Sequence, residues 1–466
     1  MEKITPYKKS RPHLNYHHIL KENRGVAVES YEKLVDEMRR ERLLYKDKTI
    51  PVLIQPYFIE KNFFDELSEI IEPIEKGLNR IIDIVLGRYD KESFSTKDKL
   101  LVSEIKDAFG LSETETELAK LNCGTDRHII IHRLDLYSGK KHSILEFNTD
   151  SAAGILETDM QIRLFKSLEP FRQLARDFPI RETDGARKIL EALLNSDYSG
   201  KSAGEAPTIC LTDWSDVGTK SEQENMAEYF SKLDYKTFLA DPREFMYKDK
   251  ALRFKDEKIH IVHRRVIMSE LVERINEVQP LVQAVRDGAV SVVNSFSSAL
   301  GSNKVILTIL SEGKFHPLLE SDTVAVMNEY LPWTRLFHRT IDNALLSKIV
   351  ENKNSYVLKK GISYGGSAVV VGRGVNKEQW KTLTEKILTS PEERWIVQKY
   401  VTPPREVYPV IREGDLKFQE LIFNINPFII EGEYVNGMAR LSFPDRHVIN
   451  VAKGGFQVPM LQIDEK

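Results

Sequence analysis

The stretch between residues 207 and 294 alternates short apolar runs with amphipathic segments, and no other feature constrains the fold of this chain as strongly. The segments that favour strands or helices come in the order strand 208–211, helix 221–233, strand 235–239, strand 259–262, helix 270–286 and strand 290–294. Strands that alternate with helices favour a parallel sheet, because each crossover helix returns the chain to the same edge. The sequence therefore predicts a small α/β unit here.

Composition places this unit in a larger chain of several domains. The sequence has 466 residues, of which 41% are hydrophobic and 29% are charged, and such a length exceeds one ordinary core. Lys and Arg number 67 against 70 Asp and Glu, so nothing demands a nucleic acid or membrane partner. No apolar run approaches the roughly 20 residues of a membrane span. With only two cysteines, we expect a reduced, cytoplasmic protein.

Helical periodicity dominates the first 125 residues. Apolar residues spaced by threes and fours between Leu67 and Val85 form one helix face, which is typical of a helix that packs on a core. Pro73 and Gly77 lie inside this segment. We therefore expect a kink or two helices rather than one rod.

Two strand-like segments on either side of a short turn predict a β-hairpin. They cover 128–137 and 142–148, with the turn at 138–141. If Ser138 lies opposite Lys141, Arg133 lies opposite Glu146 and the polar side chains of both strands share a face. A slip of one residue would send them to opposite faces.

The polar residues of this hairpin are candidate metal ligands. Arg133 and Asp135 share one strand face, as do Glu146 and Asn148 on the other strand. The expected pairing puts Asp135 opposite Ile144 and diagonal to Glu146. Carboxylate and amide oxygens bind Mg²⁺, usually together with substrate phosphates. The alternative is the solvated polar face of an amphipathic hairpin.

A second hairpin signal surrounds a glycine-containing turn. Predicted strands at 356–359 and 367–372 flank Gly361, Gly365 and Gly366, and the first strand ends in Lys359. Glycines let backbone N–H groups approach phosphate oxygens, and the lysine adds positive charge. The segment predicts a flap over a phosphate, although two glycines between strands also form ordinary turns.

The same turn matches the nucleophile motif of a serine hydrolase. Residues 361–365 fit Gly-x-Ser-x-Gly around Ser363, and Asp415 and His447 follow in the required order. That motif needs a helix after the serine, whereas the valines at 369–371 favour a strand. A hydrolase that uses Ser363 is therefore the weaker interpretation.

Two further segments offer contacts to a nucleotide. Lys304 opens a predicted helix at 304–310, and Gln398–Val401 ends a predicted strand. A strand end of this kind can present backbone groups to an adenine edge. A solvated lysine and an ordinary strand exit are the alternatives.

Taken together, these motifs resemble those of the circularly permuted ATP-grasp ligases, a group that includes glutathionylspermidine synthetase and eukaryotic glutathione synthetase. The ordered matches are Arg133-Leu134-Asp135, Glu146 to Ser151, Asp213-Trp214, Arg264-Arg265, Asn294 to Lys304, Leu331 to Arg335, Lys359 to Gly366, Gln398 to Val401, Arg440-Leu441-Ser442, Asn450 and Gly454-Gly455. In an unpermuted ATP-grasp chain the Glu-x-Asn strand follows the lysine flap, whereas here it precedes the flap. Permutation predicts that order.

The resemblance implies a fold and a set of site residues. The fold would be α/β (α+β), a circularly permuted ATP-grasp fold with a Rossmann-like subdomain and a helical N-terminal region. Mg²⁺ would be held by Asp135, Glu146 and Asn148. Arg133 would be the catalytic arginine, which stabilises an acyl phosphate. The ATP contacts would be Lys304, Lys359, Gly365, Gly366, Gln398, Lys399, Tyr400 and Val401, and the substrate contacts Arg133, Ser151 and Arg440.

The resemblance also divides the chain. The expected parts are a helical region at 1–125, the metal-binding hairpin and first part of the core at 126–205, the Rossmann-like substrate subdomain at 206–300, the lid with the glycine flap at 301–400, and the rest of the core at 401–466. Departures from the family pattern fall at Ala152, Ala153, Lys360 and Lys399.

The leading hypothesis is an ATP- and Mg²⁺-dependent ligase that joins a carboxylate to an amine or thiol through an acyl phosphate. Its substrates would be small molecules or peptides, and a homo-oligomer is left open. An ATP-binding protein without ligase activity is the alternative from a different class.

Overall fold

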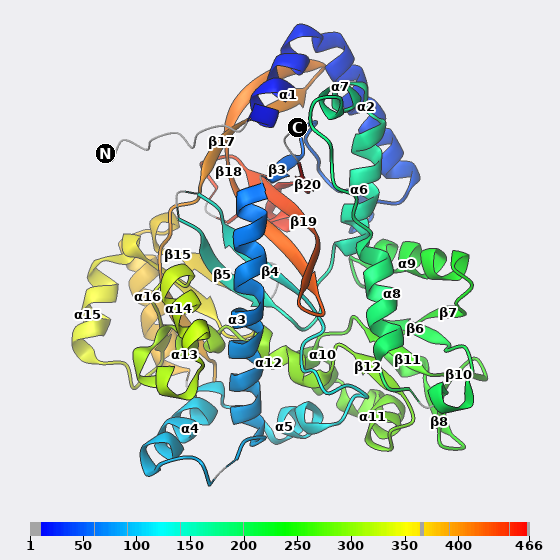
Figure 1. Cartoon of the computed structure of the whole chain (residues 1–466). Helices are drawn as coiled ribbons and strands as arrows, with labels where there is room; N and C mark the ends of the chain where they lie inside the picture. Colours follow the sequence, from blue (N-terminus) through cyan, green and yellow to red (C-terminus); the bar gives the residue numbers. More distant parts are fainter. Residues whose placement is uncertain are drawn as a thin grey trace.

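A seven-stranded sheet forms the centre of the molecule (Figure 1). The computed structural model describes residues 11–59, 61–90, 92–139, 141–198, 200–363, 368–390, 392–446 and 448–463. Neighbouring strands run in the order β3-β20-β19-β18-β4-β5, and β17 pairs with β18. Their bounds are β3 (Tyr57–Ile59), β4 (Ile131–Tyr137), β5 (Ser143–Asn148), β17 (Arg405–Arg412), β18 (Asp415–Ile430), β19 (Glu433–Ser442) and β20 (Phe456–Gln462). Segments far apart in the sequence therefore share one sheet.

The parallel sheet predicted from the alternating segments is confirmed. Its strands lie in the order β12 (Ser291–Val293), β11 (Ile261–Arg264), β6 (Ile209–Thr212) and β7 (Thr237–Ala240), and each neighbouring pair is parallel. α9 (Lys220–Lys232) connects β6 to β7. A small antiparallel sheet of β8 (Met246–Lys248), β9 (Ala251–Phe254) and β10 (Glu257–Ile259) lies beside this unit.

The single helix predicted at 270–286 is wrong. The chain forms α10 (Met268–Glu273), a short 3-10 turn and α11 (Gln279–Arg286). Pro280 lies in the first turn of α11. Proline has no backbone N–H to donate to a preceding turn, so it fits the start of a helix and not its interior.

An antiparallel sheet carries the two strands of the predicted flap. Its order is β13 (Thr334–Phe337), β16 (Trp395–Lys399), β14 (Tyr356–Lys360) and β15 (Val369–Val371). α15 (Asn343–Glu351) and α16 (Lys377–Thr389) pack on it through an apolar cluster around Trp380. α12 (Ala299–Ser302), α13 (Val305–Ser311) and α14 (Ser321–Tyr330) lead from the parallel sheet to this one.

The N-terminal region is largely helical, as predicted. Its elements are α1 (Arg11–Glu22), α2 (Arg24–Arg40), β1 (Leu44–Tyr45), β2 (Lys48–Thr49), α3 (Lys61–Leu86), α4 (Thr96–Phe109) and α5 (Glu113–Lys120). After the central hairpin come α6 (Ile155–Ser167), α7 (Glu169–Ala175) and α8 (Gly185–Asn195). Within the described residues, no helix combines the length and the apolar character that a bilayer span requires. The boundaries expected at 125, 205, 300 and 400 stay a prediction.

α3 is one continuous helix, so the expectation of two helices is wrong. Pro73 and Gly77 instead form a contact for α14. The Thr323 hydroxyl donates a hydrogen bond to the Pro73 carbonyl oxygen at 2.8 Å. A Cβ added to Gly77 would lie 2.6 Å from Thr323 Cγ2. The glycine is therefore explained by the close approach of α14.

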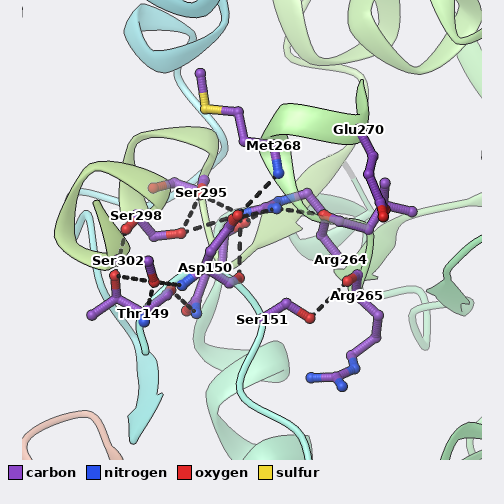
Figure 2. Close-up of polar contacts among 12 residues, drawn as sticks. Thr149, Asp150, Ser151, Arg264, Arg265, Met268, Glu270, Ser295, Ser298 and Ser302 are labelled. Carbon is purple, nitrogen blue, oxygen red and sulfur yellow. Dashed lines mark hydrogen bonds and ion pairs between the residues drawn. The ribbon is translucent and has the colours of Figure 1, made fainter. Parts of the chain in front are cut away.

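One buried ion pair joins the end of the β4–β5 hairpin to the parallel sheet (Figure 2). Asp150 follows β5 and Arg264 ends β11, and each is 1% exposed. Arg264 Nη1 lies 2.7 Å from Asp150 Oδ1, and Asp150 Oδ2 accepts a hydrogen bond from the Met268 N–H at 3.0 Å. Arg264 also donates to the carbonyl oxygens of Asn294 and Ser295. These contacts fix the hairpin relative to the α/β unit.

We expect Arg264→Met to destabilise the fold by about 3–5 kcal/mol, because it leaves the Asp150 carboxylate buried without its counter-charge. Urea denaturation followed by circular dichroism measures this as a lower midpoint. Arg172→Met is the matched control, since Arg172 pairs with Glu169 at the surface, and a surface pair contributes little. An unchanged midpoint for Arg264→Met would contradict the role given to the buried pair.

Candidate active site

The predicted metal ligands lie on one face of the β4–β5 hairpin, but the predicted register is wrong. Asp135 lies directly opposite Glu146, and Arg133 lies opposite Asn148. The expected partners were Ile144 for Asp135 and Glu146 for Arg133. The displacement at these positions is two residues, and an even displacement keeps side chains on the same face. The shared face of the four polar residues is therefore retained.

A β-bulge in β5 causes one residue of the difference, and the other arises at the turn, where Tyr137 pairs with Ser143 instead of His142. Leu136 pairs with Ile144, and the next pair along the ladder is Asp135 with Glu146. Leu145 is left as an extra residue between the two pairs. A bulge of this kind re-aims the side chains beyond it, and here it brings the two carboxylates directly opposite each other.

Asp135 is held by cationic and amide groups. Its Oδ1 accepts hydrogen bonds from Arg133 Nε and from Asn148 Nδ2, both at 3.0 Å. Its Oδ2 lies 3.6 Å from Arg440 Nη1. Arg440 belongs to β19, so the predicted substrate arginine reaches the predicted metal ligands across the sheet.

The two predicted phosphate lysines also meet this hairpin. Lys304 lies before α13, and its Nζ is 3.5 Å from Glu146 Oε2 and donates to the Ser363 carbonyl oxygen at 2.9 Å. Lys359 lies in β14, and its Nζ donates to the carbonyl oxygen of the bulged Leu145 at 3.0 Å. Both lysines are buried. Acids from the early hairpin and lysines from the later half of the chain therefore converge.

Burial and the neighbouring charges both shift the pKa values of this cluster. Burial opposes the charged form of Glu146, yet the surrounding cations, led by Lys304 and Lys359, lower its pKa to about 2. Burial lowers the pKa of Lys359 to about 8, against the opposite effect of Glu146. Burial and the neighbouring Arg133 lower the pKa of Arg440 to about 10. Four basic side chains thus face two carboxylates, an arrangement that suits a polyanionic ligand.

All of these groups except Lys304 are lining residues of a cavity of about 380 Å³. Glu146 and Lys359 face the same cavity, as do Arg133, Asp135 and Asn148. One end is walled by β14, β15 and the end of β16. The other end is walled by the loop at 151–154, by α6 and by β18 to β20. The volume falls within the range of small-molecule sites.

The predicted adenine segment lies at the first end of the cavity. Residues 398–401 all line it. The N–H groups of Lys399 and Tyr400 already donate to the carbonyl oxygens of Trp333 and Ser355, each at 2.8 Å. The Gln398 side chain donates to Thr334 Oγ1 at 3.1 Å. The nucleotide contacts of this segment stay a prediction.

The flap and the hydrolase motif share one turn. Gly365, Gly366 and His447 lie outside the described residues. Ser363 is described, and its side chain donates to the Lys360 carbonyl oxygen at 3.3 Å. β14 and β15 on either side of the turn form an antiparallel pair, whereas a nucleophile elbow needs a strand followed by a helix. The structure therefore removes the context on which the hydrolase interpretation depended.

The predicted substrate residue Ser151 begins a loop that is fixed by the α/β unit. Its hydroxyl donates to the Arg265 carbonyl oxygen at 2.6 Å (Figure 2). The Arg265 side chain donates to the Ala152 carbonyl oxygen at 2.6 Å. Glu222 of α9 accepts a hydrogen bond from the Gly154 N–H at 2.8 Å. The loop backbone is thus held against the cavity from two elements of the Rossmann-like unit.

Several cavity residues escaped the sequence analysis. They are Tyr45 and Ile50 from the N-terminal region, Glu157 from α6, Asn424 from β18 and Gln457 from β20. None lies in a motif. The alternation along residues 418–442 could have identified inward-facing positions, but only the pairing of the strands tells which of them reach the site.

Comparison with known proteins identifies the family of this chain. The family described as circularly permuted ATP-grasp type 2 matches residues 60–442. A protein that carries the name glutamate–cysteine ligase 2-2, from Frankia casuarinae, is 21% identical over 326 residues, which is 67% of this chain and 36% of that protein. One named glutamate–cysteine ligase 2-3, from Frankia alni, is 24% identical over 181 residues, 38% of this chain and 19% of that protein. The chain therefore spans only a minor part of either relative.

A solved structure shares the fold. A glutathione synthetase-like effector from Globodera pallida, in its apo form, superposes with a TM-score of 0.58 and 11% identity, over 93% of this chain and 96% of that chain. The predicted permuted ATP-grasp fold is confirmed by this likeness and by the family match. The chain belongs to the circularly permuted ATP-grasp type 2 family.

Proposed function

We propose that this protein is an ATP- and Mg²⁺-dependent ligase that joins a carboxylate to an amine or thiol through an acyl phosphate. One observation carries the proposal. Asp135, Glu146 and Asn148 from one hairpin face Lys304 and Lys359 from distant segments. Family membership and the names of the two relatives support the same chemistry. The substrates would be small molecules or peptides.

The donor set suits a nucleotide-bound Mg²⁺ better than a metal held by protein alone. It consists of two carboxylates and one amide, and among the described residues there is no cluster of three or more His, Cys, Asp and Glu side chains fit to hold an ion. Mg²⁺ commonly takes one or two carboxylates together with phosphate oxygens. When bound, it would supply charge neutralisation at the transferred phosphoryl group. Asp135, Glu146 and Asn148 would hold it.

The basic residues would stabilise most of the remaining negative charge of the nucleotide and the substrate. Lys304 and Lys359 are fixed by carbonyl oxygens, so their ammonium groups are positioned before a nucleotide arrives. Arg133 and Arg440 both contact Asp135. A change in the charge around Asp135 would weaken these contacts and let both arginines turn toward a substrate carboxylate. That carboxylate attacks the γ-phosphorus, ADP leaves, and an amine or thiol then displaces phosphate from the acyl phosphate. Gly365 and Gly366 would help to exclude water.

ADP release from ATP should rise when the correct carboxylate and the correct amine or thiol are both supplied, because phosphoryl transfer needs the acceptor carboxylate. A coupled assay for ADP over a matrix of carboxylates and amines, with Mg²⁺ and with EDTA in its place, measures this. EDTA should abolish the stimulation. Tight ATP binding without stimulation by any pair would favour a binding protein over a ligase.

Glu146→Gln should lower turnover by roughly 100-fold to 1000-fold, the scale of losing one preorganised electrostatic contact at the reacting group. The substitution removes a carboxylate that faces Lys304 and Lys359 but keeps the shape of the side chain. Steady-state ADP release and circular dichroism together test it. Glu433→Gln, an exposed glutamate at the start of β19, is the control that should behave as wild type. Wild-type turnover in Glu146→Gln would remove this residue from the metal site.

Ser363→Ala should keep ADP release at the wild-type level. Lys304 bonds the backbone carbonyl oxygen of Ser363, which alanine retains, and among the described residues the hydroxyl makes one long hydrogen bond, to the Lys360 carbonyl oxygen. The same assay, run beside a nitrophenyl ester as a hydrolase substrate, measures both activities. Loss of an ester-hydrolysing activity in this variant would revive the hydrolase interpretation.

A further inference from the structure

Glu157 is a buried cavity carboxylate that forms no direct ion pair with a described Lys, Arg or His, although Arg265 acts on it electrostatically. It belongs to α6, lines the cavity at the end away from β14 to β16, and is 8% exposed. The other carboxylates of the cavity are paired, Asp135 with two arginines and Glu146 with Lys304. In the described part of the chain, no Lys, Arg or His forms an ion pair with Glu157. Among the described residues, Glu157 is therefore the cavity carboxylate that lacks a direct ion pair.

The neighbours of Glu157 have other partners. Glu222 accepts the Gly154 N–H and lies 3.9 Å from Arg265 Nη2. Arg265 in turn bonds the Ala152 carbonyl oxygen. Burial, reinforced by Glu222, raises the pKa of Glu157 well above its usual value. A cationic group placed in the cavity would reverse this destabilisation of the carboxylate.

Three polar side chains form a row across the neighbouring strands. Asn424 of β18 pairs with Arg440 of β19, and Arg440 pairs with Gln457 of β20. All three line the cavity. Directly paired side chains lie roughly 5 Å apart, so the row is short. Gln457 at its end lies close enough to Glu157 to lower the pKa of that carboxyl, and its Nε2 is buried without a hydrogen-bond partner among the described residues.

This row sets a cation and a carboxylate on either side of Gln457. Arg440 lies at the metal side, and Glu157 lies beyond Gln457. The amide oxygen Oδ1 of Asn424 is buried and accepts no hydrogen bond in the described structure, so the row also offers an unused acceptor for an N–H group. The Arg440 cation, the Glu157 carboxylate and the unused Asn424 acceptor together match a ligand that carries a negative and a positive group a few bonds apart.

We propose that Glu157 binds the ammonium group of a zwitterionic substrate whose carboxylate lies against Arg440, which makes Glu157 a specificity-determining residue. The substrate class is then an amino acid or the equivalent end of a peptide. The inference rests on the ligase function proposed above for its role in a reaction, but binding by itself can be measured without turnover. Gln457 is the positioning residue between the two charges.

Isothermal titration calorimetry tests this on the whole protein saturated with Mg²⁺ and a non-hydrolysable ATP analogue. The probes are the protein amino acids and, for each one that binds, the same acid without its amino group. Loss of a charge-assisted contact predicts binding weaker by about 10-fold to 100-fold for the desamino probe. Glu157→Gln should remove the preference while the affinity for the ATP analogue stays unchanged. Glu182→Gln, an exposed glutamate paired with Lys166, should keep the preference.

The inference is overturned if the desamino probes bind as tightly as the amino acids, if Glu157→Gln keeps the preference, or if no amino acid binds. Glu157→Asp, which keeps the charge on a shorter side chain, replaces the first variant if that variant fails to fold, and it should weaken the preference without abolishing it. ADP release identifies which hypothesis has failed. Amino acids that bind through Glu157 without any ADP release would refute the ligase function alone, and ADP release indifferent to the amino group would refute the role of Glu157 alone.

Discussion

The ion pair between Asp150 and Arg264 is the contact on which the rest of the site depends. It ties the strand that carries Glu146 and Asn148 to the parallel sheet, and the neighbouring Arg265 holds the loop that leads from that strand to α6. Burial of both charges gives the arrangement a single energetically acceptable geometry, because an unmatched charge in the interior is costly. The metal side and the substrate side of the cavity are therefore set by two consecutive arginines, Arg264 at the end of β11 and Arg265 directly after it.

The cavity depends on contacts between segments that are remote in the chain. The bulge at Leu145 offers its carbonyl oxygen to Lys359, and the turn at Ser363 offers its carbonyl oxygen to Lys304. Each lysine is thus oriented by a backbone group from another part of the molecule. Because the backbone supplies these acceptors, substitution of the neighbouring side chains need not disturb the lysines. The positions of the two lysine side chains therefore depend on the conformation of the main chain.

Local sequence patterns predicted the helices and strands well. Features that depend on contacts between these elements could not be predicted. The alternation between 207 and 294 predicted the parallel sheet, because strand and helix periodicity are properties of neighbouring residues. The register of the hairpin could not be predicted, because neither the one-residue shift at the turn nor the extra residue at Leu145 has a local signature. Pro73 suggested a break that does not divide α3, since α14 packs on that segment. Glu157 and Gln457 were missed because they meet only through the sheet and α6.

The pairing of β3 with β20 has a consequence for how the chain is made. Tyr57 lies opposite Met460 in a parallel ladder, so the early strand has no neighbour on this side until residue 460 has been synthesised. Contacts between such distant residues are slow to form, and an unpaired strand edge invites association with other chains. The helices that flank β3 in sequence are local structures that can form first. During synthesis on the ribosome, these helices would cover the unpaired edge of β3 until translation reaches residue 460.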